Sequence, residues 1–160
     1  MGTFSIQKGR NIRLKGTAKK EIVEIPLPKH VAVQPSDFKG LSPRLSVKVD
    51  DVVNVGTPIF TDKAIPEIRV ASPASGKVVA INRGAKRALQ SIVIETDGQQ
   101  KSETFQKFSQ EQIKNVSKSD VTNALLTGNL WPVIRQRPFS KVADPHKKPK
   151  AIFIHAMNTE

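Results

Sequence analysis

Residues 47–81 read VKVDDVVNVGTPIFTDKAIPEIRVASPASGKVVAI, and this stretch decides the fold. At its start valines alternate with polar residues, which is the pattern of a strand with one buried face. The pair Asp50-Asp51 ends that strand. Gly56-Thr57-Pro58 then predicts a turn, because glycine takes a positive φ without steric cost. The stretch therefore predicts short strands separated by tight turns.

The same pattern continues to residue 95, where Ser91 to Glu95 reads SIVIE and is closed by Asp97-Gly98. Many short, β-branched strands with glycine corners and no segment of helical period favour a closed or sandwich-like β module over an open parallel sheet. The alternation places four apolar side chains in its core: Val47, Val49, Val78 and Ile92.

The chain divides near Gly98 into a mainly β module over 1–98, with its core at about 40–98, a polar linker over 99–118, and a third part over 119–160. In the third part, Ser117 or Ser119 is a suitable N-cap for a helix over 119–127, with Gly128 at the C′ position. Residues 151–156 are expected to form a buried strand. A helix followed by an apolar strand is typical of the start of an α/β domain, so we expect the chain to stop inside that domain.

Composition excludes several classes of function. The chain has no cysteine, and its three histidines, His30, His146 and His155, are too far apart in sequence for a paired metal-ligand spacing. The longest apolar runs are far shorter than a membrane span. A net charge of +12 indicates negatively charged partners. Nucleic acid is one such partner, but no known recognition motif accompanies the basic clusters, so a nucleic-acid-binding protein is only a second alternative.

Thr61-Asp62-Lys63-Ala64 lies where two β halves would meet, and Asp-Lys-Ala resembles the sequence around the modified lysine of biotinyl and lipoyl carrier domains. A carrier domain with Lys63 modified is therefore the first alternative function. The region after this hairpin is basic, whereas carriers are acidic there, and a carrier leaves the last sixty-odd residues unexplained. We predict that Lys63 is an exposed, unmodified hairpin lysine.

A more extensive resemblance runs through most of the chain. Four segments carry it in order: IRLKG (12–16), ASPASGKVVAINRGAKRALQSIVIE (71–95), LLTGNLWPVIRQRPFSKV (125–142) and AIFIHAMNT (151–159). Together they resemble the N-terminal part of the A subunit of the bacterial sodium-translocating NADH:quinone reductase. The resemblance implies a barrel-sandwich hybrid of the biotinyl/lipoyl type, followed by a short helix and the beginning of an α/β domain.

The resemblance also implies a place in the cell and a set of partners. The expected location is peripheral, on the cytoplasmic face of the bacterial inner membrane, in a complex that passes electrons from NADH to quinone and exports sodium. The expected partners are the other subunits of that complex, with an anionic membrane surface and quinone as further contacts. Flavins and iron–sulfur centres are expected in sister subunits, and no cofactor in this chain.

No nucleophile elbow, phosphate loop or histidine–carboxylate pair occurs, so we predict no catalytic, cofactor-binding or metal-binding residue. Related subunits are expected to hold a flavin in a glycine-rich loop near Gly128, but here the sequence GNLWPVIRQRPF has bulky residues that prevent close backbone approach. The candidate partner contacts are Arg135, Arg137, Phe139 and Lys141. The alternative for these residues is an aromatic core with solvated arginines.

Overall fold

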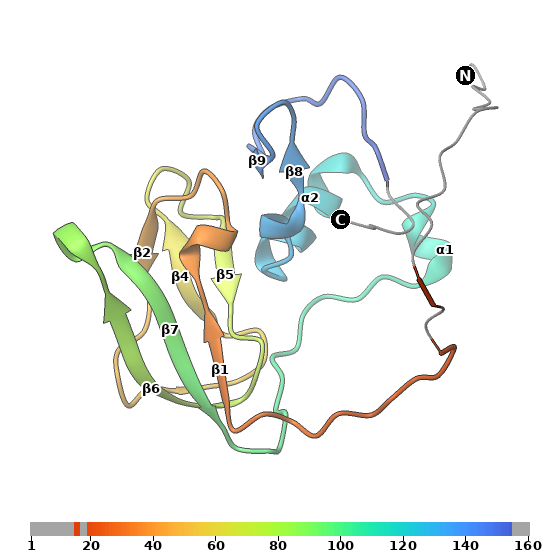
Figure 1. The fold of residues 1–160 in the computed structure, drawn as a ribbon. Coiled ribbons are helices and arrows are strands. Elements are labelled where there is room, and N and C mark those ends of the chain that lie inside the picture. Colours follow the sequence, from red (N-terminus) through yellow and green to blue (C-terminus); the bar gives the residue numbers. More distant parts are fainter. Residues whose placement is uncertain (1–14, 17–18, 155–160) are drawn as a thin grey trace.

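A computed structural model describes residues 15–16 and 19–154. Figure 1 shows the strands β1–β7 gathered in one lobe, with the helices and the β8–β9 hairpin beside it. Residues 1–14, with which the predicted β module begins, lie outside the described part of the chain.

The β lobe contains two antiparallel sheets. The first has the order β1-β7-β6-β3 and the second the order β2-β4-β5. The strands of the first sheet are β1 (His30–Val33), β3 (Val52–Val53), β6 (Gly76–Arg83) and β7 (Leu89–Thr96). Those of the second are β2 (Pro43–Leu45), β4 (Pro58–Asp62) and β5 (Arg69–Ala71). This arrangement is mainly β and agrees with the predicted barrel-sandwich hybrid.

The core lies between these sheets because side chains alternate between the two faces of a strand; in β4 a register shift lets the consecutive residues Ile59 and Phe60 both be buried. Phe60 is fully buried and meets the ring of Phe38 edge to face, with 5.8 Å between the ring centroids. The cluster around it is apolar throughout and consists of Val47, Val53, Ile59, Phe60, Val70, Val78, Ile92 and Ile94. Three of the four predicted core residues, Val47, Val78 and Ile92, are thus confirmed. Gly56 also has the predicted positive φ, of 97°.

The fourth core prediction, Val49, is wrong, because its side chain is 47% exposed. The predicted strand ends early, and Asp50 adopts a left-handed φ of 76°. The Asp51 carboxylate accepts the Lys48 backbone N–H at 2.8 Å, and the Asp50 N–H donates to the Val78 carbonyl at 2.8 Å. This turn connects the Asp50-Asp51 pair to β6 and leaves the Val49 side chain in solvent.

Part of the predicted linker belongs to the β lobe. Val55 and Ser102 form a parallel bridge, and the Glu103 carboxylate accepts hydrogen bonds from the Asn54 side chain at 3.0 Å and the Thr57 hydroxyl at 2.9 Å. The rest of the predicted linker contains one short helix, α1 (Gln110–Ile113), with Ser109 as its N-cap. Contacts with the first lobe therefore extend to about residue 103.

The predicted helix is present as α2 (Lys118–Thr127), and Ser117 is its N-cap. Its C-terminal end differs from the prediction, because Gly128 has an ordinary φ of −75° and Asn129 adopts the left-handed conformation, with a φ of 58°. The Leu130 N–H donates to the Leu125 carbonyl at 2.9 Å, as in a Schellman motif. Asparagine tolerates this conformation because of its short polar side chain.

The predicted buried strand over 151–156 is not observed in its described part, residues 151–154. Ile152, Phe153 and Ile154 are 77%, 81% and 92% exposed, and none of them belongs to a strand. Residues 155–156 lie outside the described part of the chain. A strand buries a face only when it has a neighbour, and no described segment pairs with 151–154.

Candidate docking surface

The Lys63 hairpin is ordered by the aspartate that precedes it. The buried Asp62 carboxylate accepts the backbone N–H groups of Ser42 at 2.8 Å and Ile65 at 3.2 Å. The Lys63 N–H donates to the Ser42 carbonyl at 2.8 Å, while its side chain is exposed. Asp62 therefore has a structural role in the turn, and this role accounts for the aspartate of the Asp-Lys-Ala string without any modification of Lys63.

The four candidate contact residues lie on a second hairpin, formed by β8 (Arg135–Gln136) and β9 (Lys141–Val142). Phe139 is at its turn and is 70% exposed. The Lys141 ammonium lies 5.9 Å from the centroid of the Phe139 ring, within the range of a cation–π contact. Arg137 is exposed next to them. The structure thus brings these side chains together on one short turn.

Arg135 has a different position from the other three. Its guanidinium donates to the Asp37 carbonyl at 2.9 Å and to the Ser140 carbonyl at 3.3 Å. Asp37 belongs to the short 3-10 helix η1 (Pro35–Asp37) of the β lobe. The Val142 N–H also donates to the Lys39 carbonyl, at 2.8 Å. Arg135 therefore fastens the hairpin to the β lobe, whereas Arg137, Phe139 and Lys141 remain exposed.

A shallow depression of about 510 Å³ lies beside this hairpin and is lined by Lys39, Pro138, Phe139, Ser140 and Lys141. Its apolar part comes from Pro138 and Phe139, and two ammonium groups lie at its margin. Such a surface suits a partner that combines an apolar group with negative charge. The apolar group would cover the Phe139 ring, and the negative charge would attract the Lys39 and Lys141 ammonium groups.

Sequence reasoning missed two contacts that hold the segment after α2 on the β lobe, and a third that lies within the segment. The Asn129 side-chain N–H donates to the Gly56 carbonyl at 2.9 Å. The His146 ring nitrogen lies 3.0 Å from a Glu67 carboxylate oxygen in the β4–β5 turn. Within the segment itself, the Trp131 indole N–H donates to the Ala143 carbonyl at 2.7 Å. Only Asn129 had a sequence signal, since an asparagine just after a helix suits a left-handed cap.

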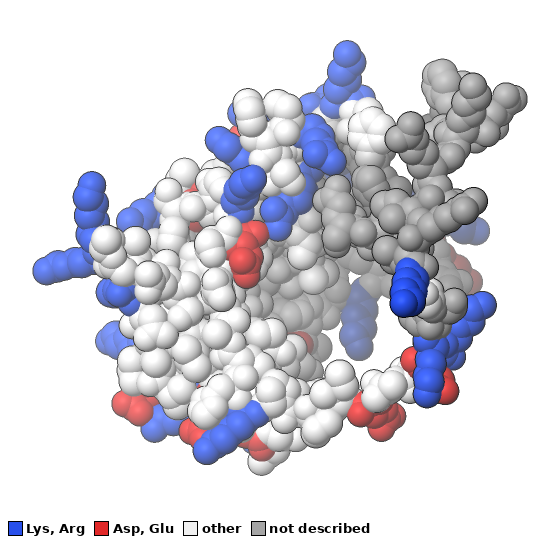
Figure 2. Space-filling view, viewed as in Figure 1, with Lys and Arg blue, Asp and Glu red and all other residues white. Residues whose placement is uncertain are grey.

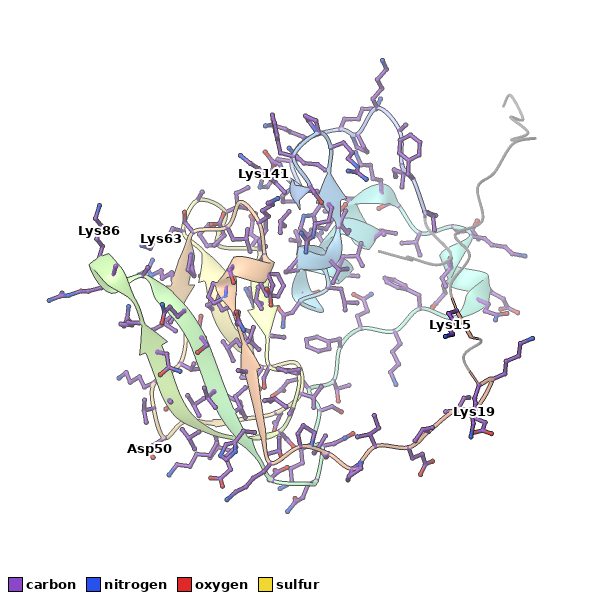
Figure 3. All side chains as sticks on the ribbon, viewed as in Figure 1. Lys15, Lys19, Asp50, Lys63, Lys86 and Lys141 are labelled. Atoms are coloured by element: carbon purple, nitrogen blue, oxygen red, sulfur yellow. The ribbon has the colours of Figure 1, made fainter. Side chains whose placement is uncertain are left out.

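Charge is unevenly distributed over the surface. Figure 2 shows Lys and Arg side chains over the upper and left parts of the visible face and also along its lower and right margins, whereas the acidic side chains lie mainly along the lower margin. Figure 3 places Lys63, Lys86 and Lys141 toward the upper end of the β lobe and Asp50 at its lower end. Acidic partners therefore fit the upper end better.

The described residues hold no group of three or more His, Asp or Glu side chains that could bind a metal ion. In the same part of the chain, no helix has the length and apolar character needed to cross a membrane.

Comparison with known proteins agrees with this fold. The family model described as the NqrA N-terminal barrel-sandwich hybrid domain matches residues 4–97, and that of the NqrA second alpha/beta domain matches residues 116–160. The A subunit of the Na(+)-translocating NADH-quinone reductase of Yersinia pseudotuberculosis is 39% identical over 157 residues, which cover 98% of this chain. The subunits of the same name from Alcanivorax borkumensis and Pseudomonas aeruginosa are 38% and 37% identical, again over 98% of this chain.

The matched residues are 35% of the length of each of these relatives. The first family match covers most of the β lobe, and the second begins just before α2, so the boundary between the matches falls in the segment that joins the two lobes. Because the chain has a barrel-sandwich fold and matches the family models and the relatives along almost its whole sequence, it belongs to the NqrA family, which comprises the A subunits of sodium-translocating NADH-quinone reductases.

Proposed function

We propose that this chain is a non-catalytic docking part of a sodium-translocating NADH:quinone reductase, in which it attaches the A subunit to its sister subunits. The names of its relatives support this assignment. We place it peripherally, on the cytoplasmic face of the membrane. The observation that carries the proposal is the β8–β9 hairpin, which Arg135 anchors to the β lobe while Arg137, Phe139 and Lys141 stay exposed.

An anchored hairpin is suited to docking because its geometry is set before the partner arrives, so little entropy is lost on binding. Aromatic and arginine side chains are also enriched at protein interfaces relative to the rest of the surface. We therefore propose that Phe139 inserts against an apolar group of a sister subunit, with Arg137 and Lys141 facing its carboxylates.

The experiment uses two variants of the full-length A subunit. One reverses the hairpin charges with Arg137→Glu and Lys141→Glu, and the other removes the aromatic ring with Phe139→Ala. A matched control, Lys107→Glu with Lys114→Glu, makes the same change of net charge at exposed sites near α1. We expect both hairpin variants, but not the control, to release sister subunits during purification from membranes at moderate salt. Unchanged subunit composition in both hairpin variants contradicts the proposal.

An anionic membrane surface and quinone are further proposed contacts of the same depression. Lys39 and Lys141 suit anionic headgroups, and the Pro138–Phe139 part suits an apolar ring. Flotation with vesicles that contain anionic lipid tests the first contact, and labelling of the hairpin by a photoreactive quinone tests the second. We expect the Phe139→Ala variant to weaken both; labelling elsewhere in the full-length protein would assign quinone to another site.

We also propose that this chain holds no flavin, iron–sulfur centre or nicotinamide nucleotide, and that sister subunits hold these cofactors. The physical support is the segment after α2, where Asn129 and Trp131 make the hydrogen bonds described above in the place expected for a glycine-rich loop. The purified chain should release no flavin on denaturation. Release of flavin in proportion to protein would contradict this.

The comparisons favour neither the carrier nor the nucleic-acid alternative. The carrier alternative has a direct test, since lipoylation of Lys63 changes the protein mass. Protein from a lipoylation-competent host should show its unmodified intact mass, and a near-quantitative lipoyl adduct at Lys63 would restore the alternative.

A further inference from the structure

The turn between β6 and β7 carries a group of cations that the hairpin just discussed does not use. Arg83 ends β6, and Lys86 and Arg87 lie in the short 3-10 helix η2 (Ala85–Arg87). We call these three residues the cationic tip. All three side chains are exposed, and Figure 3 shows Lys86 projecting from the end of the lobe, away from Asp50.

The backbone of the tip is strained. Lys86 and Arg87 both adopt left-handed conformations, with φ of 54° and 60°. This conformation is sterically unfavourable for residues with a Cβ atom, and hairpin turns that need it normally use asparagine and glycine. Two long cationic residues therefore occupy the two positions where the fold favours small ones. Strain of this kind points to a function for the side chains themselves.

Hydrogen bonds hold the tip in one shape. The Gly84 N–H donates to the Ala88 carbonyl at 2.8 Å, and the Arg87 N–H donates to the Gly84 carbonyl at 3.1 Å. The Arg83 guanidinium donates to the Arg87 carbonyl at 3.2 Å, which keeps the two arginines close to each other. Hydrogen bonds thus fix the backbone of the tip and the Arg83 guanidinium.

The cations of the tip are unpaired within the described part of the chain, whereas Lys77 of β6 and Lys29, which lies beside β7, are paired. At the opposite end, Lys77 lies 2.6 Å from the Asp50 carboxylate and Lys29 lies 3.5 Å from that of Glu95. No carboxylate among the described residues lies within salt-bridge distance of Arg83, Lys86 or Arg87. Cations are therefore paired with carboxylates near one end of the β6–β7 strand pair, whereas the cations at the other end, in the tip, are available to a partner.

We propose that the cationic tip is a second docking site, which binds a cluster of carboxylates on an acidic protein segment of a partner. Arginine binds carboxylates through two parallel N–H donors, and a fixed cluster suits carboxylates at fixed positions. A membrane surface attracts basic residues without needing a fixed geometry, and membrane-binding turns usually add an apolar side chain. No large exposed apolar side chain lies in residues 83–91, so the observations favour the protein partner.

The inference rests on the proposed docking function. Failure of the tip proposal can be distinguished from failure of the hairpin proposal, because the tip and the β8–β9 hairpin are changed in separate variants. The test uses the full-length A subunit in the assembled reductase, with a photo-crosslinking amino acid in place of Ala85, which is exposed beside Lys86. We expect cross-links to a peptide rich in Asp and Glu from a sister subunit. Cross-links to lipid alone, or to no partner peptide, would overturn the proposal.

Two charge variants sharpen the result. Lys86→Glu with Arg87→Glu should lower the cross-link yield at least tenfold, and reversing the carboxylates of the cross-linked peptide to lysine should restore it. The Lys107→Glu, Lys114→Glu control should leave the yield unchanged. Loss of yield in the control as well would mean a general charge effect and would overturn the assignment to the tip.

A third variant separates binding from folding. Lys86→Asn with Arg87→Gly relieves the left-handed strain, so the variant should melt at the same temperature as the wild-type chain or higher, while it loses the cross-link. A variant that cross-links as well as the wild-type chain would show that the cations are not needed and would overturn the proposal. If the wild-type chain binds anionic vesicles, the variant does not, and no protein cross-link forms, the proposal is overturned and the tip binds the membrane instead.

Discussion

At the scale of single residues, the side chains of the β lobe differ sharply in how much their burial contributes to stability. Val78 is fully buried, whereas Val49 is 47% exposed although both lie in valine-rich segments. Removing two methyl groups from a packed core loses transfer free energy and leaves a cavity, and the same change at the surface does neither.

We therefore predict that Val78→Ala lowers the free energy of unfolding by about 1 to 3 kcal/mol, and that Val49→Ala lowers it by less than about 0.5 kcal/mol. Denaturant midpoints of the two variants, with an unchanged slope, measure this difference. Equal losses in both variants would show that Val49 is buried in solution.

Asp97 supplies a prediction on pH. The Ser75 hydroxyl donates to its carboxylate at 2.6 Å and the Gln99 N–H donates at 2.9 Å, and these hydrogen bonds lower the pKa of Asp97 below its ordinary value. A carboxyl whose pKa is lowered by folding stabilises the protein above its unfolded pKa of about 3.9, and this contribution is lost as the pH falls through the folded pKa.

We accordingly expect Asp97→Asn to lower the melting temperature near pH 6, and the difference from the wild-type chain to shrink as the pH falls below about 4. Ser75→Ala should remove part of the same pH dependence, because it removes the first of the two hydrogen bonds. Melting curves from pH 2 to 7 measure both. A difference that stays constant down to pH 2 would mean that Asp97 contributes nothing through its charge.

At the scale of elements, the segment after β7 is part of the first lobe. Residues 101–103 lie along Val55, and the Phe105 ring lies so close to Gly56 that a Cβ there would be 2.9 Å away from it. A chain that ends at Lys107 should therefore melt at a higher temperature than one that ends at Gly98. Circular dichroism of the two truncated chains tests this, and equal melting temperatures would contradict it.

The apolar tail at residues 151–154 has no partner strand among the described residues. Its side chains are exposed and it belongs to no strand, so its amides lack the protection that a ladder supplies. We predict that amides of 151–154 exchange much faster than those of 76–81 in β6, unless the tail is sequestered in a dimer. Mass spectrometry of deuterated peptides, beside a measured molecular mass, checks this; strong protection in a monomer would contradict it.

At the scale of the whole molecule, the charges divide the β lobe into two ends with different roles. At the lower end Lys77 is paired with Asp50 and Lys29 with Glu95, while the upper end presents Lys63, the cationic tip and the β8–β9 hairpin. A molecule with a net charge of +12 that concentrates unpaired cations at one end is suited to approach an acidic assembly in one orientation. Both proposed docking sites belong to that end.

The sequence by itself determined the features that depend on neighbouring residues. Alternation along short segments predicted the strands and most of the core, Ser117 and Ser119 predicted the start of α2 to within two residues, and the order of the motifs indicated the family. The strands and the helix start depend on backbone preferences and patterns within about ten residues, and the motifs are compared as a sequence, so all of them can be read without knowing what lies nearby in space.

Only the tertiary structure decided the features that join distant parts of the chain. Arg135 bonds to Asp37, 98 positions away, and so has an anchoring role that its basic neighbours do not share. Val49 lies outside the core because Asp50 and Asp51 bond to Val78. The tip of β6–β7 is a candidate site because its cations lack the carboxylates that Lys29 and Lys77 have. Whether a charge is paired or an apolar group is covered depends on contacts made by folding, and no local pattern records those contacts.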